Sequence, residues 1–161
     1  MKSPAIFNTT RFTSQLVDFV KIRQFEQRDM DAVLRLANEH AFFDGPSTAK
    51  DFTVTFSEGF IVAEDNDEII GLAYSYFKDV PEEVLKTWGV SKVATIELLV
   101  VDPKHGKQGV GTLLVESLIG ILKQFGAELI VLTCPIQAKQ AKLLYEKVGF
   151  KVSAYHMRMK F

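Results

Sequence analysis

The chain has 161 residues, a formal net charge of −1, 47% hydrophobic residues and 24% charged residues. This length fits one domain with a sizeable core, and the composition is that of globular proteins. Because the charge is balanced, no overall field attracts nucleic acid or an anionic membrane, so neither is expected as a partner.

Cysteine and histidine usage argues against a metal centre. The single Cys134 rules out an intramolecular disulfide and a multi-cysteine zinc site, and the three histidines show no ligand spacing. We expect no metal and a reducing, cytoplasmic compartment. Neither a signal peptide nor a run of about 20 apolar residues is present, so export by that route and membrane anchoring are not expected.

Two parts of the chain are distinguished. Residues 1–20 belong to no clear element and are interpreted as an N-terminal extension, either a partly ordered tail or a segment packed on the domain or on a second subunit. Residues 21–161 are expected to form the single domain.

The first predicted elements are a strand, a helix and a hairpin. Val20–Phe25 alternates as a strand does, and Asp29 is expected to cap a helix that ends near Phe43. Phe60–Ala63 and Ile69–Phe77 are β-rich runs, and the segment between them carries Asn and Asp, which tolerate the positive φ of a tight turn.

The second half continues the alternation of helices and strands. The predicted elements are a short helix Pro81–Trp88, a buried strand Val93–Val101, a helix from Val110 to Gly126, a strand Leu129–Cys134, a helix Gln137–Val148 stopped by Gly149, and one or two closing strands over Phe150–Phe161. This succession is typical of an α/β protein.

A glycine-rich stretch joins the strand at 93–101 to the next helix. Gly106, Gly109 and Gly111 would let the backbone N–H groups of the turn and helix start point at one site, which is how phosphate is bound. A nucleotide P-loop is disfavoured because Lys107 comes too early, and a dinucleotide fingerprint because Leu114 replaces its third glycine. An ordinary glycine turn remains open.

Two separate segments resemble the GNAT family of N-acetyltransferases. IELLVVDP at 96–103 followed by QGVG at 108–111 is similar to that family's acetyl-CoA strand and pyrophosphate loop. AKLLYEKVGF at 141–150 matches the second signature, Ala-x-x-Leu-Tyr-x-x-x-Gly-Phe, at every defined position. The hairpin is similar to the second and third strands of the family, so the likeness covers about Lys21 to Phe161.

The resemblance implies a fold, a co-substrate and a reaction. The fold would be α/β (α+β), with a central mixed, largely antiparallel twisted sheet flanked by helices. The activity would be acetyl transfer from acetyl-CoA to a primary amine by direct attack in a ternary complex. The chain departs from the family at Gly106, where a long polar residue is usual and Lys107 or Gln108 would have to substitute. It departs again at Ala138, where Asn is frequent.

Specific residues receive roles from this chemistry. An amine is mostly protonated at neutral pH, so it needs a base, and Glu97 is the candidate, acting through a water; an efficient base there would be partly buried. Its alternative is a surface carboxylate, because a similar family site falls on Thr133. Tyr145 is the candidate acid for the leaving thiolate, or otherwise a core aromatic. Cys134 is interpreted as structural, since no histidine is near it in sequence.

The cofactor would be held mainly by main-chain groups, with an oxyanion donor among residues 99–101. The predicted cofactor-binding residues are Leu99, Val100, Val101, Lys107, Gln108, Gly109, Val110, Gly111 and Thr112.

The acceptor is predicted only by class. Residues 38–56 and 78–92 would set specificity for an amine-bearing small molecule or protein, and neither range matches a known pattern. A regulatory module that binds acyl-CoA without turnover is the alternative function. A homodimer is also left open.

Overall fold

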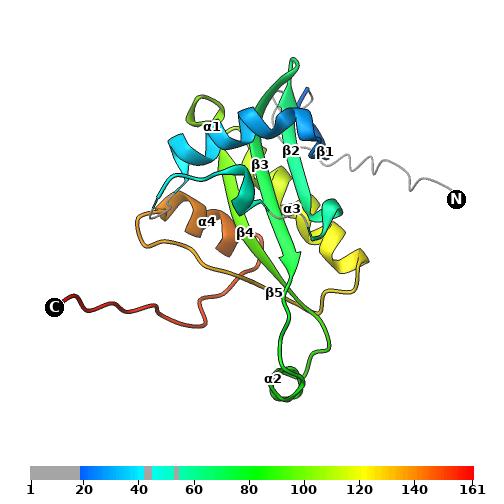
Figure 1. The fold of residues 1–161 in the computed structure, drawn as a ribbon, viewed down its shortest axis with the longest axis vertical. Coiled ribbons are helices and arrows are strands. Elements are labelled where there is room, and N and C mark those ends of the chain that lie inside the picture. Colours follow the sequence, from blue (N-terminus) through cyan, green and yellow to red (C-terminus); the bar gives the residue numbers. More distant parts are fainter. Residues whose placement is uncertain (1–18, 42–44, 53–54) are drawn as a thin grey trace, which may run out of the picture.

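The computed structural model describes residues 19–41, 45–52 and 55–161 (Figure 1). Residues 1–18, most of the predicted N-terminal extension, lie outside this description, so the extension and the domain boundary stay predictions. The strands are β1 (Lys21–Gln24), β2 (Phe60–Asp65), β3 (Glu68–Phe77), β4 (Val93–Val101) and β5 (Leu129–Leu132). The α-helices are α1 (Met30–His40), α2 (Glu82–Trp88), α3 (Val110–Gln124) and α4 (Lys139–Lys147).

The described strands form one mixed sheet in the order β1-β2-β3-β4-β5. The first three junctions are antiparallel and the β4–β5 junction is parallel, which confirms the predicted sheet class. At the β2–β3 turn, Asn66 and Asp67 have φ values of 48° and 62°, the left-handed conformation that these residue types tolerate. The parallel junction needs a crossover, which α3 supplies.

Two hydrophobic cores lie on opposite faces of the sheet. On the face crossed by α1 (Figure 1), Val33, Leu36 and Ala37 pack with strand residues that include Leu72; we call this the α1-side core. On the other face, Leu114, Leu118 and other α3 residues pack with Ala73, Ile96 and Tyr145 of α4; we call this the α3-side core. Helix α2 projects beyond the sheet and buries none of its residues.

The start of α1 differs from the prediction. Asp29 precedes the helix, but its side chain does not cap it. Its carboxylate accepts hydrogen bonds from the Glu26 N–H (2.8 Å) and from two guanidinium nitrogens of Arg23 (2.7 and 2.9 Å). A largely buried guanidinium is the stronger partner for a carboxylate, so Asp29 joins β1 to the entry of α1. The helix ends at His40, three residues before the predicted end at Phe43, which lies outside the described residues.

The closing strands predicted over Phe150–Phe161 are wrong. Residues 151–161 form no helix or strand, and every one of them is exposed. Figure 1 shows this segment running away from the sheet. An alternating pattern makes a segment competent to form a strand, but it becomes one only beside a strand that supplies its hydrogen bonds.

Candidate active site

A β-bulge in β4 places Glu97. Tyr74 is paired with Leu98 and Ser75 with Ile96, so Glu97 is an extra residue with no partner on β3. A bulge bends its strand and re-aims the side chain at the irregularity. Glu97 is accordingly exposed while its strand neighbours Ile96 and Leu98 are buried. The partial burial expected of an efficient base is not found at this residue.

The same point in β4 is where the parallel pair separates. The β4–β5 register runs from Val93↔Leu129 to Ile96↔Leu132 and stops there, although β4 continues to Val101. The predicted cofactor-binding residues 99–101 therefore pair with β3 on one edge and with no described strand on the other. Their free main-chain groups can pair with an extended ligand, as the resemblance implied.

The start of α3 leaves N–H groups available. Its first helical hydrogen bond runs from Leu113 N to Gly109 O (2.9 Å), and no side chain caps the helix. The N–H groups of Val110, Gly111 and Thr112 come before that bond, so they precede the hydrogen-bond ladder. Gly109 has a φ of 90° and Lys107 a φ of 60°. Successive N–H groups beside left-handed residues form a concave anion-binding site, so this helix start fits a pyrophosphate.

The loop before α3 is held by hydrogen bonds at its start. The buried Asp102 accepts a hydrogen bond from Lys104 N (2.9 Å), and its own N–H donates to Ile70 O (2.8 Å). That bond with Lys104 is the main cause that lowers the pKa of Asp102. Gly106 N donates to Pro103 O (3.0 Å). Lys107 is exposed and Gln108 is half-buried, so both side chains lie at the surface beside Gly106.

Helix α3 begins against α4 and the end of β4. A Cβ atom added to Gly111 would lie 2.8 Å from Leu144 Cδ1 and 3.6 Å from Val101 Cγ2. The small residue at this position therefore lets the helix start sit close to both neighbours. The predicted loop, the end of β4 and the helix that carries Tyr145 are thus brought together. Among the predicted cofactor-binding residues, Val110 can contribute only its main chain, because its side chain is buried in the α3-side core.

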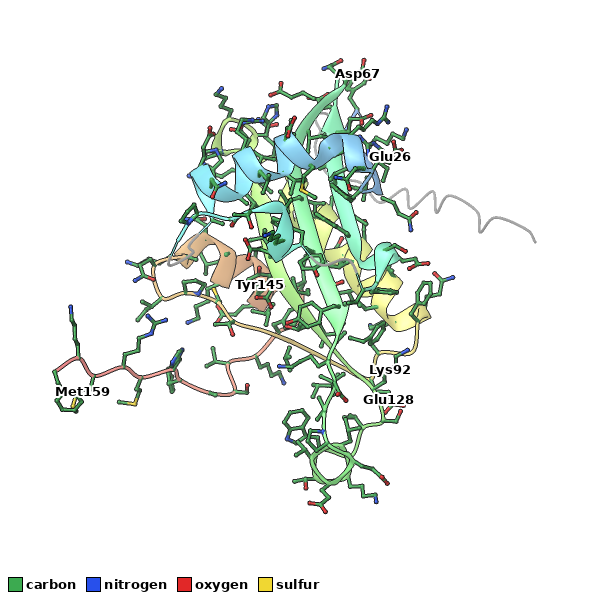
Figure 2. All side chains as sticks on the ribbon, viewed as in Figure 1. Glu26, Asp67, Lys92, Glu128, Tyr145 and Met159 are labelled. Carbon is green, nitrogen blue, oxygen red and sulfur yellow. The ribbon has the colours of Figure 1, made fainter. Side chains whose placement is uncertain are left out.

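Among the tyrosines of the site, Tyr145 has the most strongly raised pKa. Its side chain is 8% exposed, and Figure 2 shows it where α4 meets the sheet. Its ring packs edge-on against Phe150 with centroids 5.7 Å apart, and Phe150 N donates to Tyr145 O (2.9 Å) after the turn at Gly149. Burial, and secondarily the nearby Cys134, raises the pKa of Tyr145 to about 12. The phenol therefore keeps its proton at neutral pH.

Cys134 has the surroundings of a structural thiol. It is half-buried, and its Sγ lies 3.8 Å from the carbonyl oxygens of Pro135 and Ala138. Burial raises the pKa of the thiol, which disfavours the nucleophilic thiolate. Ala138 itself precedes α4 without a side-chain cap, so the departure from Asn at this position has no compensating cap.

A pocket of about 390 Å³ opens on the α1 side of Glu97. Tyr76 Oη lies 3.3 Å from Glu97 Oε2, and burial together with this carboxylate raises the pKa of Tyr76. The pocket is lined by Gly45, Pro46, Ser47, Asp51, Phe52, Tyr74, Glu97 and Leu98. Of the two ranges predicted to set acceptor specificity, residues 38–56 contribute to this pocket and residues 78–92 do not.

Sequence reasoning missed the aromatic rings at this pocket, which are Phe52 and Tyr74 in its lining and Tyr76 beside Glu97. Tyr74 and Tyr76 alternate along β3, and their rings lie 6.0 Å apart. Phe52 contacts Tyr74 edge-on with ring centroids 5.7 Å apart. Two tyrosines two residues apart on one strand are a signal that they share a face. The partner ring at Phe52 comes from a separate loop and has no such signal.

Within the described ranges, no group of three or more His, Cys, Asp or Glu side chains is arranged to hold a metal ion. The described helices also include none with the length and apolarity to cross a bilayer.

Comparisons with known proteins agree with this geometry. No curated protein sequence matches the chain significantly. The transcriptional regulator from Bacillus halodurans is 27% identical with a TM-score of 0.71, over 88% of this chain and 99% of that one. Ard1 from Thermoplasma volcanium is 20% identical with a TM-score of 0.70, over 84% and 85% of the two chains. Arabidopsis thaliana Naa50, in complex with the bisubstrate analogue CoA-Ac-MVNAL, is 16% identical with a TM-score of 0.67, over 84% and 85%.

These structures share the fold of the chain, and a family comparison adds the sequence evidence. The model of the acetyltransferase (GNAT) family matches residues 20–150, which include the bulged strand, the glycine loop and Tyr145. The chain therefore belongs to the acetyltransferase (GNAT) family and is an acetyl-CoA-dependent acyltransferase, as its two motifs predicted.

Proposed function

We propose that this enzyme transfers the acetyl group of acetyl-CoA to a primary amine bound in the pocket beside Glu97. The observation that carries the proposal is the position of the β4 bulge. It puts Glu97 in the pocket at the residue where β4 parts from β5, next to the free strand edge that would hold the acyl donor. Donor and acceptor would meet there in a ternary complex.

The residues predicted for the cofactor fit its parts. The uncapped N–H groups of 110–112 suit a pyrophosphate, and the free edge of 99–101 suits the extended pantetheine with an oxyanion donor. When bound, acetyl-CoA supplies an activated acyl group. The new C–N bond forms as the C–S bond breaks, so the amine must lose one proton and the leaving sulfur must gain one.

Glu97 is proposed to accept the proton of the amine. A carboxylate at the solvent-open mouth of the pocket can take this proton directly or through one water. Tyr76 Oη, 3.3 Å from Glu97 Oε2, would orient that carboxylate.

Tyr145 is proposed to stabilise the leaving sulfur. A phenol with a pKa of about 12 holds its proton more tightly than a thiol with a pKa of about 8.5. Its main contribution is therefore a hydrogen bond to the developing thiolate, and the leaving sulfur takes its proton from water. The phenol remains a donor throughout the neutral range.

The pocket favours a cationic acceptor. Its lining carries the carboxylates of Asp51 and Glu97 and the rings of Phe52 and Tyr74, and no Lys or Arg is among the lining residues that the structure describes. Aromatic faces and carboxylates attract ammonium groups. We therefore propose an amine that keeps a second positive charge, on a small molecule or a peptide, in the cytoplasm where the lone cysteine stays reduced.

The test is release of coenzyme A, measured by chromatography, across mono- and dicationic amines. Tyr145→Phe and Glu97→Gln should each lower kcat about 100-fold, with an unchanged Kd for acetyl-CoA by calorimetry. The matched controls are Tyr155→Phe and Glu116→Gln, which alter an exposed hydroxyl and an exposed carboxylate and should keep full activity.

Failure of the wild type to bind acetyl-CoA would overturn the proposal. Binding without turnover of any amine would instead support the regulatory alternative, an acyl-CoA-binding module.

A further inference from the structure

The segment that follows α1 forms one side of the acceptor pocket. Its described part, residues 45–52, contributes most of the lining residues, and Figure 1 shows it on the face of the sheet that α1 crosses. The pocket contains two carboxylates, because Asp51 of this segment lines it together with Glu97 of β4. The proposed transfer uses Glu97 to accept a proton and gives Asp51 no part in the chemistry. Asp51 is therefore available for recognition of the acceptor.

Asn38 fastens this segment to α1 through two reciprocal hydrogen bonds. Its Nδ2 donates to Ser47 O (3.1 Å), and its Oδ1 accepts from Ser47 N (2.6 Å). An amide side chain offers a donor and an acceptor side by side, so it satisfies both main-chain groups of one residue. The neighbours Leu36 and Ala37 of Asn38 are buried in the α1-side core, so these bonds tie the segment to a firmly packed helix.

The carboxylate of Asp51 is oriented by Thr48. Asp51 Oδ2 accepts hydrogen bonds from Thr48 N (2.6 Å) and from Thr48 Oγ1 (2.9 Å). The main-chain bond, and secondarily the hydroxyl bond, lowers the pKa of Asp51, so the group is ionised at neutral pH. In the part of the chain that the structure describes, no cation lies within ion-pair distance of Asp51, and no group donates to its Oδ1. A ligand can therefore bind this oxygen.

Asp51 lies between two anchors of the segment. One is the Asn38–Ser47 pair, and the other is the buried ring of Phe52, which stacks on Phe60 with ring centroids 5.6 Å apart. A carboxylate that is held in place before a ligand arrives loses little further freedom on binding, so more of the attraction appears as affinity.

We propose that Asp51 binds the second positive charge of the acceptor and that Asn38 is a positioning residue that keeps Asp51 at the pocket. This assignment rests on the proposed function, in which the reacting amine lies beside Glu97. The two carboxylates come from separate elements, so each takes a different nitrogen of the same molecule. The acceptor class is therefore an amine whose second cationic nitrogen is separated from the reactive one by a spacer.

The probes are dimethylaminoalkylamines of increasing spacer length. Each has one reactive primary amine and one tertiary amine, which carries a proton at neutral pH. Each is compared with its carbon isostere, in which a CH group replaces the tertiary nitrogen, so the two molecules differ by one charge. Calorimetry measures their Kd values for the full chain saturated with coenzyme A, which lacks the acetyl group and leaves the amine unreacted.

The wild type should bind the best charged probe more tightly than its isostere. Asp51→Asn should raise the Kd of that charged probe about 5-fold and leave the Kd of the isostere unchanged, because an exposed ion pair contributes up to about 1 kcal/mol. The matched control is Asp67→Asn, which removes the same charge at the tip of the β2–β3 hairpin, outside the pocket lining (Figure 2). It should keep both Kd values.

Asn38 is tested through its dependence on Asp51. Asn38→Leu removes both hydrogen bonds to Ser47 and should raise the Kd of the charged probe by a smaller factor, whereas Asn38→Asp keeps the acceptor for Ser47 N and should recover most of this loss. In the Asp51→Asn background, Asn38→Leu should have no further effect. In turnover of the charged probe, both single variants should raise KM and leave kcat unchanged.

The outcomes separate this inference from the proposed function. Equal Kd values for probe and isostere in the wild type, or no binding of any probe, overturn the role of Asp51. So does an Asp51→Asn variant that behaves like Asp67→Asn. Additive effects of the Asn38 and Asp51 variants overturn the positioning role. A charge preference that depends on Asp51, without turnover of any amine, upholds this inference and contradicts the proposed function; turnover without charge preference does the reverse. An unchanged Kd for coenzyme A reports that each variant is folded.

Discussion

Two glycines of α3 have the same backbone torsion and different surroundings. Gly109 before the helix and Gly126 after it both have a φ of 90°. A side chain in this conformation is strained at either position, by about 1–2 kcal/mol. A Cβ at Gly126 would meet nothing closer than Lys92 Cδ at 3.8 Å, far from the proposed phosphate site. A comparison of substitutions at the two glycines therefore distinguishes the cost of backbone strain from an effect on cofactor binding.

We predict that Gly109→Ala and Gly126→Ala lose similar free energies of unfolding, but that only Gly109→Ala weakens acetyl-CoA binding. The Kd should rise at least about 10-fold, because a Cβ in the loop keeps the pyrophosphate from the N–H groups. Urea unfolding and calorimetric titration measure the two effects. Equal Kd values for both variants would place the pyrophosphate elsewhere.

Tyr145 also makes stability depend on pH. Its pKa is about 12 in the fold and about 10 in the unfolded chain, so only the unfolded state ionises between these values. The contribution is fully present below pH 10 and is lost as the pH rises toward 12. Between pH 9 and 11 the wild type should lose about 1 kcal/mol more unfolding free energy than Tyr145→Phe, measured by urea unfolding. Parallel pH curves would mean that the phenol is not desolvated.

At the scale of elements, one guanidinium, that of Arg23, joins β1 to β2 and to the entry of α1. Arg23 of β1 binds Asp29 at 2.7 Å, before α1, and Glu64 of β2 at 2.6 Å, with side-chain exposures of 12%, 5% and 17%. The guanidinium is the main cause that lowers the pKa of Asp29. The stabilisation that Asp29 contributes is therefore present above its unfolded pKa and is lost as the pH falls through the lower folded value.

Asp29→Asn should destabilise the fold by about 3 kcal/mol, because it leaves a largely buried guanidinium with one carboxylate instead of two. Thermal unfolding measures this as a Tm lower by roughly 6–12 °C for a chain of this size. Asp31→Asn, on an exposed residue two positions further along the chain, should change stability by less than about 0.5 kcal/mol. Similar losses in both variants would rule out a special role for the Arg23 pair.

Local patterns predicted the elements whose signals are local. The strand 93–101 has its predicted bounds because its apolar run is unbroken, and Gly126 and Gly149 end their helices with positive φ as expected. The predicted helix cap at Asp29 was wrong because the ion-pair partner of Asp29, Arg23, lies on another element, β1. The bulge at Glu97 depends on the register between β4 and β3, so the identity of residue 97 does not predict it.

At the scale of the whole molecule, the two proposed substrates approach from opposite faces of the sheet. The acceptor pocket lies with Tyr74 and Leu98 of the α1-side core, and Tyr145 belongs to the α3-side core. The paired strands β4 and β5 separate the two faces as far as Ile96, where the β4–β5 pairing ends. The proposed function therefore puts the reaction beyond Ile96, where β4 and β5 have separated.

The extra residue in β4 also reverses the face of the sheet on which the even-numbered side chains lie. Before it, the even-numbered Ala94 and Ile96 belong to the α3-side core, whereas after it the even-numbered Leu98 and Val100 belong to the α1-side core. Loss of Glu97 would therefore do more than remove a carboxylate. It would move every later side chain of the strand to the opposite face and exchange the residues that this part of β4 contributes to the two cores. The position thus tolerates a change of side chain far better than a change of chain length.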